Sequence, residues 1–395
     1  MRWNRIVGQD HAKAILIAAL RNGRLAHAYC IWGPSGVGKD ALAIEVARVV
    51  NCSNPIETPE SIEACNQCRN CVLMDSLQHP NVQLIFSLPA AGRSAATEDE
   101  SPLLRLSDEH IALLQEQLAI KARNPYHDIR LPNATQIRIA SIRDVRRTLQ
   151  LSAPNQSGWR VVIISEADAM TTEAANAFLK TLEEPHPRTT LILTTSRRDH
   201  LPPTILSRCQ HIHCGYLSDD QIAAALVERY GVPIERASII ATLAQGSFSR
   251  AIELVHSSRD IEQFSDFALK FLRTVAKPTR YRTELFGLVE QITSSADRTA
   301  IVIQLQMILA WLRDAHMLQS LGAAAANRLV FRFGDPHRSL QRFVEHYYHA
   351  SLAEAINAVD DAIAAVESNA QVPLTLITLA LRLRRALKTV PHSSS

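Results

Sequence analysis

A glycine-rich segment near the start of the sequence restricts the fold of this chain more than any other feature. Residues 33–40 read Gly-Pro-Ser-Gly-Val-Gly-Lys-Asp, directly after an apolar run at 28–32 and directly before a helical pattern at 39–50. This is the setting of a phosphate-binding loop, in which glycines turn backbone N–H groups toward an anion and a lysine reaches the outer phosphates. The start of the following helix adds a partial positive charge. The candidate phosphate ligands are Gly33, Gly36, Gly38 and Lys39.

Short apolar runs and helical patterns alternate through the first half of the chain. The expected strands are 28–32, 82–86, 161–165, 190–194 and 210–213, and the expected helices between them are 39–50, 141–151 and 172–183. Alternation of this kind is typical of a parallel sheet with crossover helices. Together with the glycine-rich segment, it predicts an α/β P-loop domain.

The strand signals end near residue 217, and only helical patterns follow. Short helices are expected at 220–230, 234–245 and 248–254, and long amphipathic helices over 284–387. Because 395 residues exceed one domain of ordinary size, we expect three domains. These are an α/β domain over 1–214, a small helical lid domain over 215–276 and an all-α domain over 277–395. Residues 88–133 fit neither pattern and are expected to form an insertion loop with one short helix near 108–118.

Charge and composition exclude several classes of protein. The 42 Lys and Arg residues exceed the 39 Asp and Glu residues by only 3, too small a surplus to indicate nucleic-acid or membrane binding. No run approaches the roughly 20 apolar residues of a membrane span. Residues 1–9 lack the apolar core of a secretory signal. We expect a soluble, cytoplasmic protein whose partners must be inferred from local features.

Two positions that hold magnesium in such folds are altered here. The residue after Lys39 should be Ser or Thr, whose hydroxyl ligates Mg²⁺, and it is Asp40. Ser165 replaces the carboxylate expected at the end of the strand 161–165, although Glu166 remains where it would polarise water. The Asp40 carboxylate would also repel triphosphate oxygens. These changes argue against tight binding of ATP or ADP with Mg²⁺ and predict a fold that has lost hydrolysis, unless Glu166 or Asp168 takes over the metal.

Four of the seven cysteines lie close together in the sequence. Cys52, Cys65, Cys68 and Cys71 form the pattern C-x12-C-x2-C-x2-C. Four thiolates suit tetrahedral Zn²⁺, and short C-x2-C steps are typical of structural zinc sites. Because all four positions around the metal would be filled by protein, the pattern predicts a structural zinc module rather than a catalytic metal. An iron–sulfur cluster and uncoordinated thiols are the alternatives.

One arginine is displayed near the expected nucleotide edge of the sheet. Ser207-Arg208-Cys209 follows a short helical stretch, and residues 194–196 end a strand on the side where phosphates would lie. An arginine in such a position can act on the nucleotide of a neighbouring subunit, as arginine fingers do. The residues alone leave open whether Arg208 is a finger or a surface arginine at a helix end.

Several of these segments together resemble one known family. They are 33–39, the four-cysteine module, 161–168, the run Asn-Ala-Phe-Leu-Lys-Thr-Leu-Glu-Glu-Pro at 176–185, and Ser207-Arg208-Cys209. The combination is similar to bacterial clamp-loader subunits of the AAA+ class, and most similar to the delta prime family of DNA polymerase III. The resemblance runs from residue 5 to about 254 and is weaker beyond, and the 88–133 insertion is not part of the family pattern.

The resemblance implies a function and a set of partners. It implies a non-hydrolysing, stationary subunit in a pentameric ring with ATP-hydrolysing gamma or tau subunits and a delta subunit that opens the sliding clamp. Arg208 would then be a finger acting in trans on the ATP of the adjacent motor subunit, and the C-terminal helices would form an oligomerisation collar. DNA would be reached through the complex.

Other readings of the same residues stay open. The segment 246–251 resembles a sensor motif, so Arg250 would face this chain's own nucleotide pocket, unless it is a solvent-exposed arginine at a helix start. Two alternative functions remain. One is an active gamma/tau-like ATPase, in which Glu166 acts on water and Asp40 holds the metal. The other is a zinc-dependent DNA-binding module with a decayed phosphate loop.

Overall fold

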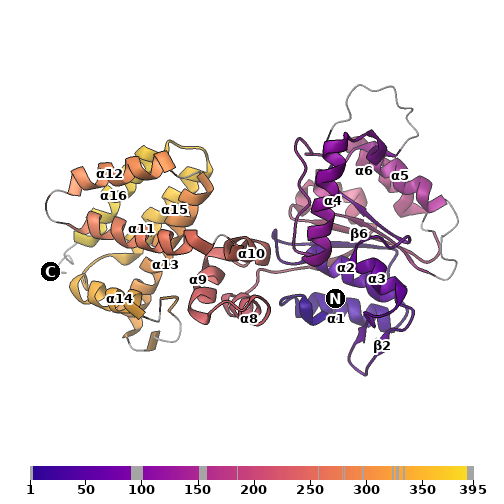
Figure 1. Ribbon diagram of the computed structural model, residues 1–395, viewed down its shortest axis with the longest axis horizontal. Coiled ribbons are helices and arrows are strands. Elements are labelled where there is room, and N and C mark those ends of the chain that lie inside the picture. Colours follow the sequence, from indigo (N-terminus) through magenta and orange to yellow (C-terminus); the bar gives the residue numbers. More distant parts are fainter. Residues whose placement is uncertain are drawn as a thin grey trace. The chain divides into compact units, whose positions relative to one another are not determined.

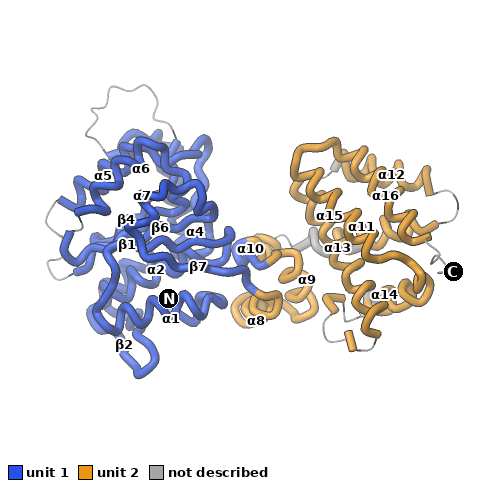
Figure 2. Tube along the Cα trace, turned by 180° about the vertical axis from the view of Figure 1, so that it is seen from behind, with its two compact units in different colours: residues 1–217, 246–249 blue, residues 218–245, 250–395 orange. Residues whose placement is uncertain are grey.

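The chain divides into two compact units, which Figure 2 shows in different colours. The computed structural model describes residues 3–89, 101–150, 158–184, 186–256, 258–277, 279, 281–295, 298–322, 324–325, 329–331 and 334–388. Unit 1 comprises residues 1–217 and 246–249, and unit 2 comprises 218–245 and 250–395. The first division falls three residues from the predicted end of the α/β domain at 214.

A parallel sheet forms the centre of unit 1, with its strands in the order β4-β5-β6-β1-β7. The strands are β1 (Ala28–Trp32), β4 (Val82–Ile85), β5 (Arg160–Ile164), β6 (Thr189–Thr195) and β7 (Gln210–His213). Every pairing in this sheet is parallel. All of β6 is buried, as expected for a strand covered on both faces. The five predicted strands are confirmed, with ends within one residue.

Helices cover both faces of this sheet, as Figure 1 shows. Phe178 and Leu182 of α6 pack with Val145 of α5 against Val162 and Leu191 of the sheet, and α2 covers the opposite face. The helices of unit 1 are α1 (Asp10–Arg21), α2 (Lys39–Asn51), α3 (Arg69–Asp75), α4 (Asp108–Arg123), α5 (Ile139–Gln150), α6 (Thr172–Glu183) and α7 (Pro203–Leu206). Short 3-10 turns lie at Trp3–Arg5, Pro102–Arg105, Ala167–Ala169 and Arg198–His200. A small hairpin of β2 (Ile56–Glu57) and β3 (Ile62–Glu63) completes the unit.

The predicted insertion contains more regular structure than its sequence pattern indicates. Residues 90–100 of it lie outside the described part of the chain. The expected helix at 108–118 runs on to Arg123, and Ser107 caps it by accepting a hydrogen bond from the His110 N–H. Leu114 and Lys121, two turns apart, are both buried, so one face of this helix packs on the rest of unit 1. The longer helix follows from that packing, because its sequence is only weakly amphipathic.

Unit 2 consists of helices. They are α8 (Asp219–Tyr230), α9 (Ile234–Ala244), α10 (Phe248–His256), α11 (Ser258–Ala276), α12 (Tyr281–Ser295), α13 (Arg298–Leu321), α14 (Gly334–His346), α15 (Leu352–Glu367) and α16 (Val372–Lys388), α10 beginning in unit 1. Helix α13 is central, because it packs against α9, α11, α14 and α15. Apart from residues 215–217 and 246–249, the predicted lid and all-α segments fall within this one unit, so their separation at 276 stays a prediction. Within the described residues, no helix has the length and apolarity needed to cross a membrane.

Candidate functional site

The phosphate loop requires its glycines. Gly33, Gly36 and Gly38 have φ angles of 150°, 75° and 102°, which side-chain-bearing residues rarely adopt. A Cβ atom at Gly33 would lie 2.0 Å from the carbonyl oxygen of Cys214, and one at Gly36 would lie 2.0 Å from Oγ of Ser247. The loop leaves the end of β1 and leads into α2, which is the predicted strand-loop-helix arrangement.

The lysine of the loop is bound to the loop itself. Its Nζ atom donates hydrogen bonds to the carbonyl oxygens of Gly33 at 2.9 Å and Pro34 at 2.6 Å, and to Oγ of Ser196 at 3.1 Å. Lys39 is 8% exposed, and burial lowers its pKa while the charge of Asp40 opposes that shift. The Lys39 ammonium group therefore stabilises the loop, and its role as a phosphate ligand stays a prediction.

Asp40, the unusual residue after Lys39, is fully engaged by protein groups. Its Oδ2 accepts from Nζ of Lys121 at 2.7 Å and from Oγ of Ser165 at 2.5 Å, and its Oδ1 accepts from Oγ1 of Thr194 at 2.7 Å. Burial alone would raise the pKa of Asp40, but the charge of Lys121 and these hydrogen bonds outweigh it and hold the pKa at about 2. Asp40 is therefore ionised throughout the neutral range.

The sequence interpretation missed the residues that cover the loop. They come from the predicted insertion, in the segment that follows α4. Tyr126 is buried against Gly38, and its hydroxyl accepts a hydrogen bond from the Val7 N–H at 2.8 Å. The cavity beside the loop, lined in part by Tyr126 and Asp128, is only about 30 Å³. That volume is enough for a water molecule. The one signal in the sequence was Asp40 itself, because a carboxylate at this buried position requires a positively charged partner.

The two other acidic residues near the loop have separate environments. Glu166 lies at the edge of the cavity with a φ of 50°, where partial burial raises its pKa and the charges of Asp128, Asp168 and Asp40 raise it further. Asp168 accepts from Oγ1 of Thr195 at 2.7 Å and from Nε of Arg197 at 2.8 Å. Asp168 is thus engaged in an ion pair beside β6.

Arg208 lies in the turn between α7 and β7 and is accessible. Its side chain is 37% exposed, and its Nη2 is 2.9 Å from Oε1 of Glu183, at the end of α6. Its Nη1 donates to the carbonyl oxygen of Thr204 at 2.9 Å. An exposed ion pair of this kind contributes little to stability, about 1 kcal/mol or less. The guanidinium group is therefore held in place without being buried.

Arg250 is placed in unit 2. Its guanidinium group donates to Oε1 of Gln245 at 3.3 Å and to Oε1 of Gln306, on α13, at 2.5 Å. Arg250 is therefore bound by protein groups and is not the solvent-exposed arginine that was the alternative. Its role as a sensor of nucleotide stays a prediction.

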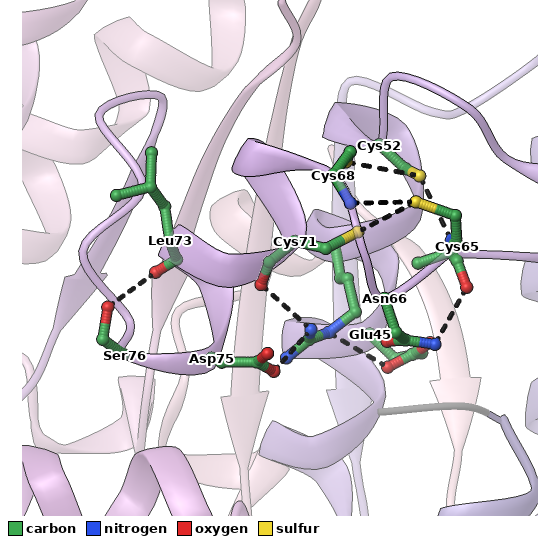
Figure 3. A network of polar contacts seen from close by, with 11 residues as sticks. Glu45, Cys52, Cys65, Asn66, Cys68, Cys71, Leu73, Asp75 and Ser76 are labelled. Atoms are coloured by element: carbon green, nitrogen blue, oxygen red, sulfur yellow. Dashed lines mark hydrogen bonds and ion pairs between the residues drawn. The ribbon is translucent and has the colours of Figure 1, made fainter.

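The four clustered cysteines meet in space, as Figure 3 shows. Cys52 directly follows α2, Cys65 follows β3, Cys68 precedes α3, and Cys71 lies in the first turn of α3. Their Sγ atoms all lie within 4.8 Å of one another. The Sγ atoms of Cys52 and Cys68 are 4.0 Å apart, and those of Cys65 and Cys71 are 3.9 Å apart. Sulfur atoms at the corners of a tetrahedral zinc site are about 3.8 Å apart, from a Zn–S distance of about 2.3 Å.

The surroundings of the cluster also suit a metal-bound thiolate. Two backbone N–H groups donate to sulfur, from Cys65 to Cys52 at 3.2 Å and from Cys68 to Cys65 at 3.3 Å. Such contacts stabilise charge on ligand sulfur. The donor set therefore fits one zinc ion, which would tie the end of α2 to α3. The remaining cysteines, Cys30, Cys209 and Cys214, are buried apart from this cluster.

A buried acid next to the cysteine module predicts a pH effect. Glu45 on α2 is fully buried, neither carboxyl oxygen has a hydrogen-bond partner, and Nε of Arg48 is 3.7 Å away. Burial raises the pKa of Glu45 from 4.5 to about 7. Because the folded pKa is raised, the free energy of unfolding should fall as pH rises from about 4.5 to about 7, by about 3 kcal/mol.

The variant Glu45→Gln tests this expectation. It should be more stable than the original chain by about 3 kcal/mol at pH 8 and close to it at pH 4.5, because only the ionised carboxylate is penalised. Urea denaturation at both pH values measures the difference. Equal stability changes at the two pH values would contradict the expectation.

Comparison with known proteins identifies related sequences. The family model described as DNA polymerase III, delta subunit, matches residues 8–217. The DNA polymerase III subunit delta′ of Bacillus subtilis (strain 168) is 24% identical over 378 residues, covering 95% of this chain and 96% of that protein. The subunit delta′ of Pseudomonas aeruginosa is 31% identical over 193 residues, covering 48% of this chain and 43% of that protein.

A tau subunit of DNA polymerase III and a gamma subunit-related protein are also similar. The subunit tau of Bacillus subtilis (strain 168) is 27% identical over 260 residues, 64% of this chain, and the match spans only 37% of tau. A solved gamma subunit-related protein from Thermotoga maritima aligns over 94% of this chain and 99% of its own, with 16% identity and a TM-score of 0.40.

The family match spans more than half of the chain and nearly all of unit 1. That region contains the phosphate loop, the four cysteines and Arg208. The delta′ relative from Bacillus subtilis adds similarity along almost the full length of both chains. This chain therefore belongs to the DNA polymerase III delta subunit family, among the delta′ and other clamp-loader subunits.

Proposed function

We propose that this chain is the delta′ subunit of a DNA polymerase III clamp loader. In this role it hydrolyses no ATP and acts as a stator in a ring with gamma/tau and delta subunits. It supplies Arg208 to the ATP of a neighbouring motor subunit while a sliding clamp is loaded on primed DNA. The C-terminal helices serve as the oligomerisation collar, and a structural zinc ion holds the cysteine module.

The engagement of Asp40 is the observation that carries this proposal. Both of its carboxylate oxygens accept hydrogen bonds from side chains of this chain. At the position where a Ser or Thr normally ligates magnesium, this chain therefore has a carboxylate that is bound by protein groups. Since hydrolysis in this type of site depends on magnesium, the arrangement supports a non-hydrolysing subunit.

An active gamma/tau-like ATPase is the second candidate, because tau subunits are among the relatives. It would need Asp40 to release its protein partners and hold a metal, with Glu166 acting on water. It would also need the cavity of about 30 Å³ beside the loop to open. The DNA-binding alternative has no comparable observation in its favour.

Hydrolysis assays on the full chain separate the two candidates. The purified chain should release phosphate from ATP no faster than its Lys39→Ala variant, because magnesium has no place at Asp40. Mixed with gamma/tau, delta and the sliding clamp, the same preparation should support DNA-dependent ATP hydrolysis, which proves that it is folded. Turnover by the chain alone that disappears in Lys39→Ala would establish the ATPase instead.

A further inference from the structure

Three residues meet at one point in unit 1, and two of them depart from a magnesium-dependent phosphate loop. Asp40 replaces a hydroxyl residue, Ser165 replaces a carboxylate, and Lys121 comes from α4. The Asp40 carboxylate accepts from Lys121, Ser165 and Thr194 at 2.7, 2.5 and 2.7 Å. A magnesium ion needs oxygen lone pairs at about 2.1 Å in octahedral geometry. Here Nζ of Lys121 lies 2.7 Å from Oδ2 of Asp40, so a cationic group already occupies the carboxylate and the arrangement does not fit that ion.

Lys121 brings the opposite charge to this point. Its side chain is only 1% exposed, and its Nζ atom lies 2.7 Å from both Oδ2 of Asp40 and the carbonyl oxygen of His127. A buried ammonium group is stable only when paired with an anion and hydrogen-bonded. Lys121 and Asp40 satisfy that requirement for each other.

We propose that Lys121 is a built-in substitute for magnesium: its ammonium group is the cation that the Asp40 carboxylate and the carbonyl oxygen of His127 hold. The change from hydroxyl to carboxylate at position 40 is then explained, since an ammonium group needs a charged acceptor where a metal would use a neutral ligand. Lys121 determines which cation this position accepts and excludes divalent ions by occupying it.

The chain segment that follows Lys121 holds this substitute in place. Tyr126, five residues later, packs on Gly38 and accepts from the Val7 N–H, and its carbonyl oxygen accepts from Oγ of Ser249 at 2.6 Å. These contacts attach the end of α4 to both sides of the phosphate loop. The ammonium group is therefore anchored by tertiary packing as well as by its charge.

Removing the ammonium group should turn this position into a divalent-cation site. In Lys121→Met the side chain keeps its length, but the Asp40 carboxylate loses its counter-charge and keeps its oxygen neighbours. We expect the full chain to lose about 10 °C in Tm. We also expect it to bind Mn²⁺ about tenfold more tightly than the original chain, measured by electron paramagnetic resonance. Mg²⁺ should restore part of the lost Tm.

Two further variants control this test. Asp40→Asn/Lys121→Met removes both charges, so it should recover most of the lost Tm and show no gain in Mn²⁺ affinity. Lys13→Met removes a lysine that pairs with the exposed Asp10 at 3.6 Å, and neither Tm nor Mn²⁺ affinity should change. If Lys121→Met does not fold, recovery of folding in the double variant still demonstrates the charge pairing.

The proposal has clear contrary outcomes. It is wrong if Lys121→Met folds and binds Mn²⁺ no better than the original chain, or if the double variant is no more stable than Lys121→Met. It is equally wrong if the original chain binds Mn²⁺ tightly and Asp40→Asn abolishes that binding. These measurements use the chain alone, so they are independent of whether Arg208 acts on a neighbouring subunit.

Discussion

Replacing Arg208 by alanine should reduce ATP hydrolysis at the neighbouring motor subunit by about 10³-fold, while the purified chain keeps its stability. Arginine fingers stabilise the charge that develops on the transferred phosphoryl group and contribute factors of that order. Stability should change by about 1 kcal/mol or less, because the ion pair with Glu183 is exposed. Single-turnover hydrolysis in the reconstituted complex is the appropriate measurement, since it isolates the sites that depend on this chain.

Two variants make this result specific. Arg208→Lys keeps the positive charge but loses the planar fork of donors, so we expect an intermediate loss of hydrolysis. Arg197→Ala removes another exposed arginine of unit 1, paired with Asp168 at 2.8 Å, and should leave partner hydrolysis close to the original. If Arg208→Ala assembles normally and hydrolysis in the complex is unchanged, Arg208 is not a finger.

Removing one ligand of the cysteine cluster should have the largest effect on stability. We expect the original chain to bind one zinc ion at these cysteines, and we expect Cys65→Ser to lose it and to lower the free energy of unfolding by an amount of order 5 kcal/mol. Structural zinc contributes about 10–16 kcal/mol to zinc-finger peptides, and here part of the surrounding fold persists without it. Mass spectrometry measures the metal content. Urea denaturation with and without a chelator measures the free energy of unfolding.

The matched control for Cys65→Ser is Cys209→Ala. Cys209 is a buried cysteine outside the cluster, and it packs in the core between the sheet and α6. This variant should keep its zinc and respond to the chelator as the original chain does. A structural metal would be contradicted if the original chain contains no zinc when purified, is no more stable than Cys65→Ser and does not respond to a chelator. Iron and acid-labile sulfide in its place would identify the iron–sulfur alternative.

Much of unit 1 could be predicted from the sequence because its signals are local. The strand, the phosphate loop and α2 are contiguous, and the glycines at 33, 36 and 38 are required by their own backbone angles. Three of the four clustered cysteines lie within seven residues, so chain geometry alone brings them close. Helix α6 and strand β1 begin and end where hydrophobic periodicity and apolar runs place them.

The pairing of charges was not predictable in the same way. Lys121 and Asp40 are 81 residues apart, and nothing in the local pattern distinguishes Lys121 among 42 basic residues. The same holds for Arg208 with Glu183 and for Arg197 with Asp168, whose contacts link separate elements.

The sequence alone determined that the magnesium position is altered, because the residue that replaces the hydroxyl is visible in the motif. Only the tertiary structure decided what that carboxylate binds, because the packing of α4 selects its partner. A buried ion pair forms only where folding brings two oppositely charged side chains within contact distance, and that distance is set by the tertiary structure.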